Sequence, residues 1–184
     1  MVNEKPKLTL EQFLRLPESD RSLELVDGEV VPKMSPKFFH SSLTTVFWVE
    51  FSRWCDGLGR IRVEWSVILK RNEQDWVPVP DLLYVSYDRL SKDWCEDAPC
   101  PVAPELVIEI LSPEQRFNQL ASKAIDYLNA GVDRVWLVFP PMRSITVFFA
   151  DRPPETYRDD RLIEDELFPE LALTAEQFFE KAGI

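Results

Sequence analysis

The segment from Pro104 to Pro140 constrains the fold more than any other part of the chain. It reads PELVIEILSPEQRFNQLASKAIDYLNAGVDRVWLVFP, so that an apolar run, a helical pattern and a second apolar run follow one another. This order is typical of a strand, a helix and a second strand that form one unit. We therefore expect an α/β fold in which this helix packs against a sheet.

The helix of this segment has residues at both ends that are typical of helix boundaries. Ser112, Pro113 and Gln115 stand where an N-cap, a first helical residue and a capping-box partner belong, and Gly131 stands where the helix would end. Its apolar stripe is formed by Phe117, Leu120, Ala121, Ala124 and Leu128. Such a stripe is typical of a helix that covers a sheet.

Other elements are predicted by the same criteria. Asp27 and Gly28 lie between two β-rich runs and predict a tight hairpin. Helices are expected over residues 9–17, with Thr9 and Gln12 as a capping pair, and over residues 39–55 and 174–181. Strands are expected over residues 61–69, 79–85 and 144–150, and polar, turn-rich segments over residues 87–104 and 153–170.

Composition limits the class of protein. The 184 residues, 45% hydrophobic and 29% charged, suit one soluble domain that spans residues 1–184. No apolar run reaches the roughly 18 residues of a membrane span, and the start lacks a signal-peptide core, so we expect a cytoplasmic protein. Three cysteines and one histidine are too few for a zinc site; we expect reduced thiols, with a Cys95–Cys100 bridge as the alternative.

The net charge of −11 argues against a protein that coats nucleic acid through charge alone. Such binding needs clustered Lys and Arg that release counterions from phosphates. Any contact with DNA must therefore come from a local basic patch. A divalent cation in an acidic pocket would supply part of the missing positive charge.

Glu109 is the first candidate site residue, because it interrupts the apolar run from Leu106 to Leu111. The pattern predicts that this strand is buried on both faces. A lone buried carboxylate costs several kcal/mol or takes up a proton, unless it is paired, hydrogen-bonded or bound to a metal ion. Glu109 therefore needs a partner.

Asp81 and Lys123 are the candidate partners in the site. Asp81 follows Pro80 at the entrance of a second apolar strand, and a neighbouring strand would bring it close to Glu109. Two adjacent carboxylates repel unless a divalent cation binds both, and magnesium accepts one or two carboxylates while keeping several waters. Lys123 flanks the helix stripe, so its ammonium can reach the same sheet face, orient an attacking water and stabilise charge on a phosphate.

The order of these motifs resembles a known family. The motifs are, in order, ELVDGE, MSP with a histidine downstream, PDLLYV, PELVIEILSP, and a helical Lys and Tyr before GVDRVWLV. In this order they resemble the motifs of the bacterial putative restriction endonucleases of the PD-(D/E)XK superfamily. The resemblance runs from about residue 8 to the C-terminal helix. It implies a restriction-endonuclease-like mixed central sheet flanked by helices, with an N-terminal hairpin. It also implies hydrolysis of DNA phosphodiester bonds with Mg²⁺ or Mn²⁺, and similar folds often form homodimers.

The resemblance also implies the roles of the site residues. Asp81 corresponds to the aspartate of the PD motif and Glu109 to the acid of the third motif, and both would bind the metal ion. The lysine of the third motif is displaced in this branch from the strand, where Leu111 stands, to the helix at Lys123. Glu24 corresponds to the helper acid at the front of the site.

The chain departs from the family pattern at two positions. Members commonly carry an aspartate four residues before the helical lysine, where this chain has Gln119, so weaker support of Lys123 or reduced activity is expected. The Pro-Gly-Leu turn near the end is Pro169-Glu170-Leu171 here, which concerns the folding of the tail.

Plainer interpretations remain open for the acids. Glu109 could form a structural ion pair with an arginine or with Lys123 itself. Glu24 could be a solvated or cross-strand acid of a hairpin, and Glu29 is assigned to the turn and the surface. Glu105, on the same strand face as Glu109, is a secondary candidate at the solvent end.

Tyr127 is interpreted as a packing residue whose hydroxyl reaches the pocket rim, and His40 as a polar residue at a helix start. For the chain as a whole, the alternative to an endonuclease is a catalytically weak or inactive nuclease-fold module. Such a module would bind nucleic acid or a protein partner.

Overall fold

The computed structural model describes residues 7–17 and 19–184. Its centre is a six-stranded sheet in the order β10-β9-β8-β7-β6-β3, in which β7 and β8 are parallel and the other neighbours are antiparallel. The strands are β3 (Gly59–Val63), β6 (Leu82–Ser86), β7 (Leu106–Ile110), β8 (Arg134–Phe139), β9 (Ser144–Phe149) and β10 (Glu155–Arg158). The predicted α/β class with a mixed sheet is confirmed.

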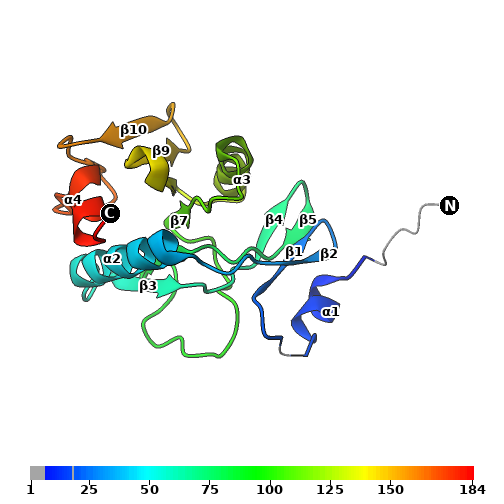
Figure 1. Ribbon diagram of the computed structural model, residues 1–184. Helices are drawn as coiled ribbons and strands as arrows, with labels where there is room; N and C mark the ends of the chain where they lie inside the picture. Colours follow the sequence, from blue (N-terminus) through cyan, green and yellow to red (C-terminus); the bar gives the residue numbers. More distant parts are fainter. Residues whose placement is uncertain (1–6, 18) are drawn as a thin grey trace.

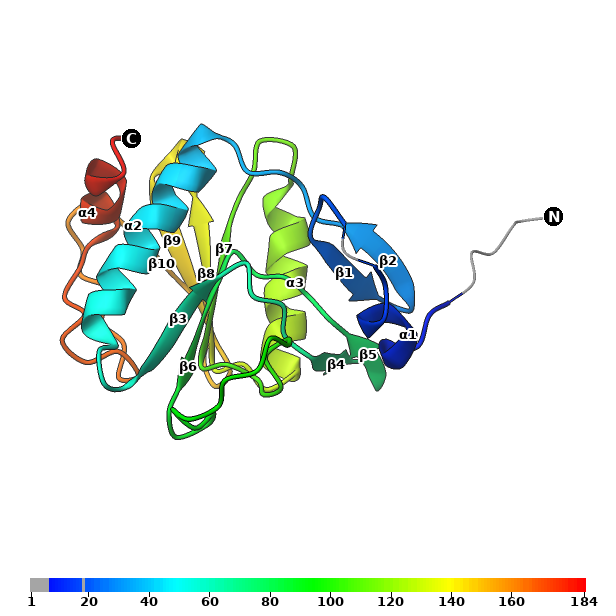
Figure 2. The same ribbon diagram turned by 90° about the horizontal axis from the view of Figure 1, so that it is seen from below.

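Helices cover both faces of this sheet (Figure 1). Figure 2 shows α2 (Phe38–Trp54) and α4 (Ala175–Lys181) on one face and α3 (Phe117–Asn129) on the other. Beyond α3 lie helix α1 (Leu10–Leu14) and two hairpins, β1 (Leu23–Val26) with β2 (Glu29–Pro32), and β4 (Leu69–Arg71) with β5 (Gln74–Trp76). A 3-10 turn, η1 (Pro140–Met142), joins β8 to β9.

The alternation of side chains along β7 determines which face each one reaches. Leu106, Ile108 and Ile110 pack into the core beneath α2 and α4. Val107 belongs to the second core, beneath α3. Because side chains of a strand alternate between faces, Glu109 lies on the α3 face.

The pairing of β6 with β7 fixes the position of Asp81. Leu82 lies opposite Ile108 in this antiparallel pair, so the next step of the register brings Asp81 opposite Glu109. The backbone N–H of Ile110 donates to Asp81 Oδ2 at 2.7 Å. The backbone of β7 therefore holds Asp81 at the start of β6.

Several predicted elements occur as expected. The hairpin turns at Asp27 and Gly28, which have φ of 53° and 81°, as a tight turn of this kind requires. Capping boxes at Thr9 and Thr174 begin α1 and α4. All three cysteines are free. Within the described ranges, no helix is both long and apolar enough to cross a membrane.

The predicted start of α3 at Ser112 is wrong. The helix begins at Phe117, because Arg116 is an extended N-cap with φ of −106° and ψ of 138°. The Gln115 side chain accepts a hydrogen bond from the Ser112 N–H, while the Gln115 N–H bonds to the Ser112 carbonyl oxygen. These two bonds close a separate turn before the helix. The C-terminal end is as predicted, with Gly131 at φ of 97°.

Two predictions about strands are also wrong. The strand expected over residues 61–69 ends at Val63, because Glu64 has φ of 48°, outside the extended region. Val67 is fully buried in an irregular segment, so the alternation reflected burial rather than a continuous strand. Part of the polar tail forms β10, an edge strand in which Tyr157 alone is buried, and this pattern was too weak to predict.

The Pro169-Glu170-Leu171 turn generates a stability prediction. Glu170 has φ of 68°, a left-handed conformation that costs a residue with a side chain about 1 to 2 kcal/mol. We expect Glu170→Gly to raise the free energy of unfolding by about 0.5 to 1 kcal/mol. The gain is smaller than the strain that is relieved, because glycine is more flexible in the unfolded chain. Urea denaturation measures this difference. The control Glu164→Gly, at a position without positive φ, should give no gain; equal effects of the two substitutions would contradict the prediction.

Candidate active site

Glu109 is buried on the α3 face with two partners from the same helix. Its exposed fraction is 6%. The Tyr127 hydroxyl donates to Glu109 Oε1 at 2.8 Å, and Lys123 Nζ lies 2.9 Å from the same oxygen. Burial raises the pKa of Glu109, the Lys123 charge lowers it and the Asp81 charge raises it further, so that the pKa lies above its ordinary value. The site therefore leaves this carboxylate incompletely compensated.

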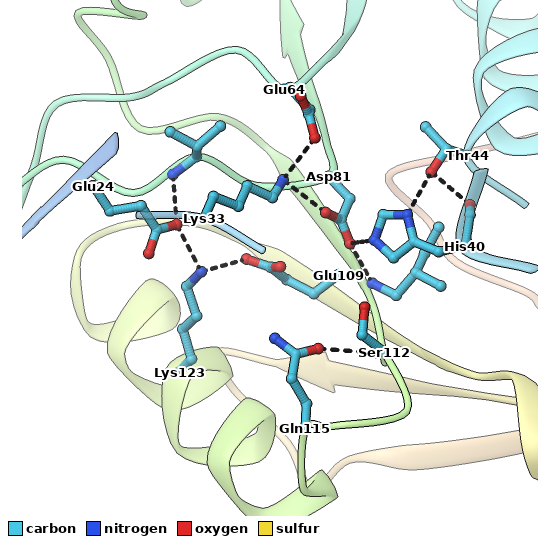
Figure 3. Close-up of polar contacts among 12 residues, drawn as sticks. Glu24, Lys33, His40, Thr44, Glu64, Asp81, Glu109, Ser112, Gln115 and Lys123 are labelled. Atoms are coloured by element: carbon cyan, nitrogen blue, oxygen red, sulfur yellow. Dashed lines mark hydrogen bonds and ion pairs between the residues drawn. The ribbon is translucent and has the colours of Figure 1, made fainter. Parts of the chain in front are cut away.

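Lys123 links Glu109 to the N-terminal hairpin (Figure 3). Its Nζ lies 3.1 Å from Glu24 Oε1, which also accepts a hydrogen bond from the Val79 N–H at 2.9 Å. Burial lowers the pKa of Lys123, but the charges of Glu109 and Glu24 outweigh it, and the pKa is raised. Lys123 is therefore an ammonium ion held between two acids.

Asp81 is bound from three directions. It is 2% exposed; its Oδ1 lies 2.7 Å from Lys33 Nζ, and its Oδ2 lies 2.9 Å from His40 Nε2 in addition to the Ile110 N–H. Burial raises the pKa of Asp81, but the His40 hydrogen bond and the Lys33 charge outweigh burial and lower the pKa to about 2. Asp81 is therefore ionised throughout the neutral range.

Lys33 is a member of the site that was not predicted from the sequence, and His40, interpreted as a polar residue at a helix start, is another. Lys33 follows β2, and its Nζ also lies 3.5 Å from Glu64. This nitrogen is buried and makes no well-directed hydrogen bond among the described residues, so it is held mainly by charge. His40 was marked as the one histidine, downstream of the MSP motif. No comparable pattern marked Lys33.

The other candidates lie outside this cluster or support it indirectly. Glu105 binds Ser86 and Arg89 at the opposite end of β7, and Glu29 is exposed at the start of β2. The Gln119 side chain accepts from the Arg116 N–H at 3.2 Å and so helps to cap α3, one turn before Lys123. Tyr127 is fully buried, and its hydroxyl reaches Glu109 rather than a solvent-facing rim.

The structure thus brings Glu24, Asp81, Glu109 and Lys123 to one end of the sheet, together with Lys33 and His40 (Figure 3). They form two sets of contacts: Asp81 with Lys33 and His40, and Lys123 with both glutamates. Among Glu24, Asp81, Glu109, Lys33 and Lys123, three carboxylates against two ammonium groups leave one excess negative charge when all five are ionised, and Glu64 beside Lys33 adds a further negative charge.

The chemistry of these donors fits a hard divalent cation. No group of three potential His, Cys, Asp or Glu ligands is gathered within residues 7–17 and 19–184. Magnesium needs no such group, since it is usually bound through one or two carboxylates and retains several waters. Two opposed carboxylates with an uncompensated charge suit that mode of binding.

The lowered pKa of Asp81 predicts a pH dependence of stability. A carboxyl whose pKa falls from 3.8 to about 2 on folding stabilises the protein at neutral pH by about 2 kcal/mol, and this contribution is lost as the pH falls below about 4. Urea unfolding of wild type and Asp81→Asn should therefore show a stability difference that shrinks on acidification. The exposed control Asp93→Asn should show a small difference at every pH; an Asp81 difference that is independent of pH would contradict the assignment.

The chain is similar to known proteins in sequence and in fold. Residues 10–176 match the Uma2 family, described as putative restriction endonucleases. A crystal structure of a putative nuclease of the DUF820 family from Anabaena variabilis is similar to the chain, with a TM-score of 0.82 and 24% sequence identity. The match covers 95% of this chain and 99% of that one, and it shows that the two share a fold. No curated protein matches. The match over residues 10–176 spans most of the chain, which therefore belongs to the Uma2 family of putative restriction endonucleases.

Proposed function

We propose that the chain is a metal-dependent endonuclease that hydrolyses DNA phosphodiester bonds. The observation that carries the proposal is the placement of two buried acids, Asp81 and Glu109, opposite each other on adjacent strands with the Lys123 ammonium beside one of them. Burying these two acids costs free energy, because each carboxylate would be more stable in water, so their burial requires an explanation. Family membership supports the same activity.

In this proposal Asp81 and Glu109 hold the Mg²⁺ or Mn²⁺ ion. A bound ion would supply Lewis-acid stabilisation of the phosphate and lower the pKa of a water molecule. The protein supplies the geometry around it: the Ile110 N–H and His40 orient Asp81, and Tyr127 orients Glu109. These contacts come from rigid elements, which keeps the ligands in place.

Lys123 assists the nucleophile in this scheme. Its ammonium is fixed by Glu24 and Glu109, so it can hold a water molecule or stabilise the negative charge that develops on the phosphate without reorganising. Glu24 acts through Lys123, because its other contact is to the Val79 backbone. Glu24 is therefore a positioning residue.

The alternative function, a catalytically weak or inactive nuclease-fold module, is favoured by one observation. Each candidate ligand already has a cationic partner in the structure, Lys33 at Asp81 and Lys123 at Glu109. A protein that binds DNA with a steep salt dependence, yet cleaves nothing with any divalent ion, would support this alternative.

Substitution of the two acids tests the endonuclease. Asp81→Asn and Glu109→Gln should each lower the rate of plasmid cleavage in Mg²⁺ or Mn²⁺ by at least about a hundredfold, and calorimetry should show weaker binding of Mn²⁺. Glu105→Gln is the matched control, since it alters an acid next to the same strand but away from the cluster, and it should retain both properties. Equal cleavage, or equal affinity for Mn²⁺, in wild type and Asp81→Asn would remove the proposal.

Lys33 provides an independent test of where the ion binds. Its ammonium neutralises Asp81 and is also stabilised by the Glu109 charge, so a divalent ion at these acids must compete with it. Lys33→Met should therefore bind Mn²⁺ at least about tenfold more tightly than wild type, because one repelling charge is removed. The exposed substitution Lys92→Met should leave the affinity unchanged. Weaker binding by Lys33→Met would place the ion elsewhere.

We also propose that the 184 residues act as one nuclease domain and assemble as a homodimer, since symmetric pairs present two sites to two strands. Light scattering of the purified protein determines the assembly; a monomer at working concentration would exclude the dimer.

A further inference from the structure

The first turn of α2 forms one wall of a cavity of 460 Å³, which we call the α2 cavity. Its lining includes Lys37, Phe38, Phe39, His40, Ser112 and Gln115. Lys37 is an extended N-cap whose side chain makes no capping hydrogen bond, so no side chain of the N-cap satisfies the N–H groups of this turn. Such a helix end presents N–H donors and a partial positive charge, and this wall therefore attracts anions.

Two polar side chains of the α2 cavity have unused donors. Ser112 is 7% exposed, and its hydroxyl makes no hydrogen bond within residues 7–17 and 19–184. Gln115 accepts the Ser112 N–H at 3.0 Å, and because an N–H bonds only to an acceptor, the amide oxygen is the bound atom. The amide nitrogen of Gln115 is the free end, and it has no partner in the described part of the chain either. Buried donors without partners cost free energy, so these two groups indicate a ligand that accepts hydrogen bonds.

Both donors lie beside the candidate active site. Figure 3 shows the Ser112 hydroxyl directed toward Asp81 and His40. Ser112 follows Ile110, whose N–H binds Asp81, by two positions, which is about 7 Å along an extended chain. The bond between Gln115 and Ser112 keeps the second donor at the same place. The free donors therefore begin where the acidic cluster ends.

The charge of this lining differs from that of the whole chain. The chain carries −11, whereas the residues that line the α2 cavity, among those that the structure describes, include Lys37 and no aspartate or glutamate. Lys37 forms an ion pair with Glu114, but Glu114 is not part of the lining. An anion in this cavity consequently meets donors and no carboxylate.

The other walls are apolar and limit the kind of anion. They are formed by phenylalanine, leucine and proline side chains, among them Phe39, Leu111 and Phe139. A free phosphate ion gains nothing from such walls, because it is polar on every side. In a DNA strand each phosphate adjoins a deoxyribose, whose carbon atoms can pack against apolar side chains. The lining therefore favours a phosphodiester over inorganic phosphate.

We propose that Ser112, Gln115 and the first turn of α2 bind a backbone phosphate of the DNA substrate, one that neighbours the cleaved phosphate. This inference rests on the proposed endonuclease function and adds the residues that hold the strand beside the acidic cluster. Contacts to backbone phosphates fix the register of a strand and carry no sequence information. The contact therefore positions DNA of any sequence.

Substitution of the free donors tests this proposal without cleavage. The full chain, with divalent ions chelated by EDTA, is titrated against a short fluorescent duplex and against one of its strands, with anisotropy as the readout. Gln115→Glu keeps an oxygen for the Ser112 N–H but replaces the amide nitrogen by a charged oxygen, which repels a phosphate. It should weaken DNA binding by at least about tenfold, and Ser112→Ala, which removes one donor, by at least about threefold.

Gln119→Glu is the matched control. Gln119 accepts the N–H of Arg116, three residues before it, as Gln115 accepts that of Ser112, but Gln119 does not line the cavity. Both substitutions change the charge equally, so Gln119→Glu should weaken binding by less than about twofold in physiological salt, which screens distant charges. Equal effects of the two glutamate substitutions, unchanged affinity in Ser112→Ala, or no DNA binding by wild type would overturn the proposal. Urea midpoints close to that of wild type show that the variants are folded, and Ser112→Ala decides where Gln115→Glu is not.

Nuclear magnetic resonance separates the sources of the phosphate. The side-chain amide signal of Gln115, identified by its loss in Gln115→Glu, should shift when the duplex is added to nitrogen-15-labelled protein. The same concentration of inorganic phosphate should leave it in place. A shift with inorganic phosphate and none with DNA would assign the α2 cavity to a free anion and overturn the inference.

Failure of this inference and failure of the proposed function give different results. If Gln115→Glu loses DNA binding while wild type cleaves no DNA with any divalent ion, the endonuclease fails and the phosphate contact stands. If wild type cleaves DNA and Asp81→Asn does not, while Gln115→Glu and Ser112→Ala bind DNA as wild type does, the endonuclease stands and this inference fails.

Discussion

The site depends on the ionic compensation of Glu109, a carboxylate inside a strand that is otherwise apolar. β7 is covered by α2 and α4 on one face and by α3 on the other, so this side chain is largely shielded from water, with an exposed fraction of 6%. The protein places an ammonium and a phenol against it from consecutive turns of one helix. The position of α3 on the sheet therefore also determines the chemistry of the site, because moving the helix would leave a buried charge without partners.

The same compensation extends through the N-terminal hairpin. Lys123 is shared between Glu109 on the sheet and Glu24 on β1, and Glu24 in turn binds the Val79 N–H shortly before Asp81. The hairpin lies outside the central sheet, yet it contributes one acid from β1 and, after β2, one lysine to the cluster. Its docking therefore gives Asp81 a cationic partner and Lys123 a second acid, while the net charge of the cluster stays the same.

Much of the fold could be predicted from the spacing of apolar residues, and two members of the site from single residues that conflict with their surroundings. Glu109 interrupts an apolar run and Asp81 begins another, and both conflicts identify positions that the structure brings together. Lys33 could not be found in this way, because a lysine between a hairpin and a loop is ordinarily solvated, and its burial results from tertiary packing alone. The start of α3 and the end of β3 were mispredicted for a related reason: the backbone angles of Arg116 and Glu64 are set locally, while the apolar pattern continues past them.

The alternation of β7 also limits which changes in chain length the protein tolerates. Leu106, Ile108 and Ile110 face the core that contains Phe51 and Trp136, and Glu109 faces the opposite way only because it directly adjoins both isoleucines in the strand. An insertion or deletion of a single residue ahead of Glu109 would turn the carboxylate toward those aromatic rings and a leucine or isoleucine toward Lys123. Changes in chain length can thus be accommodated only in the loops on either side of this strand, while positions within it tolerate substitution but not insertion or deletion.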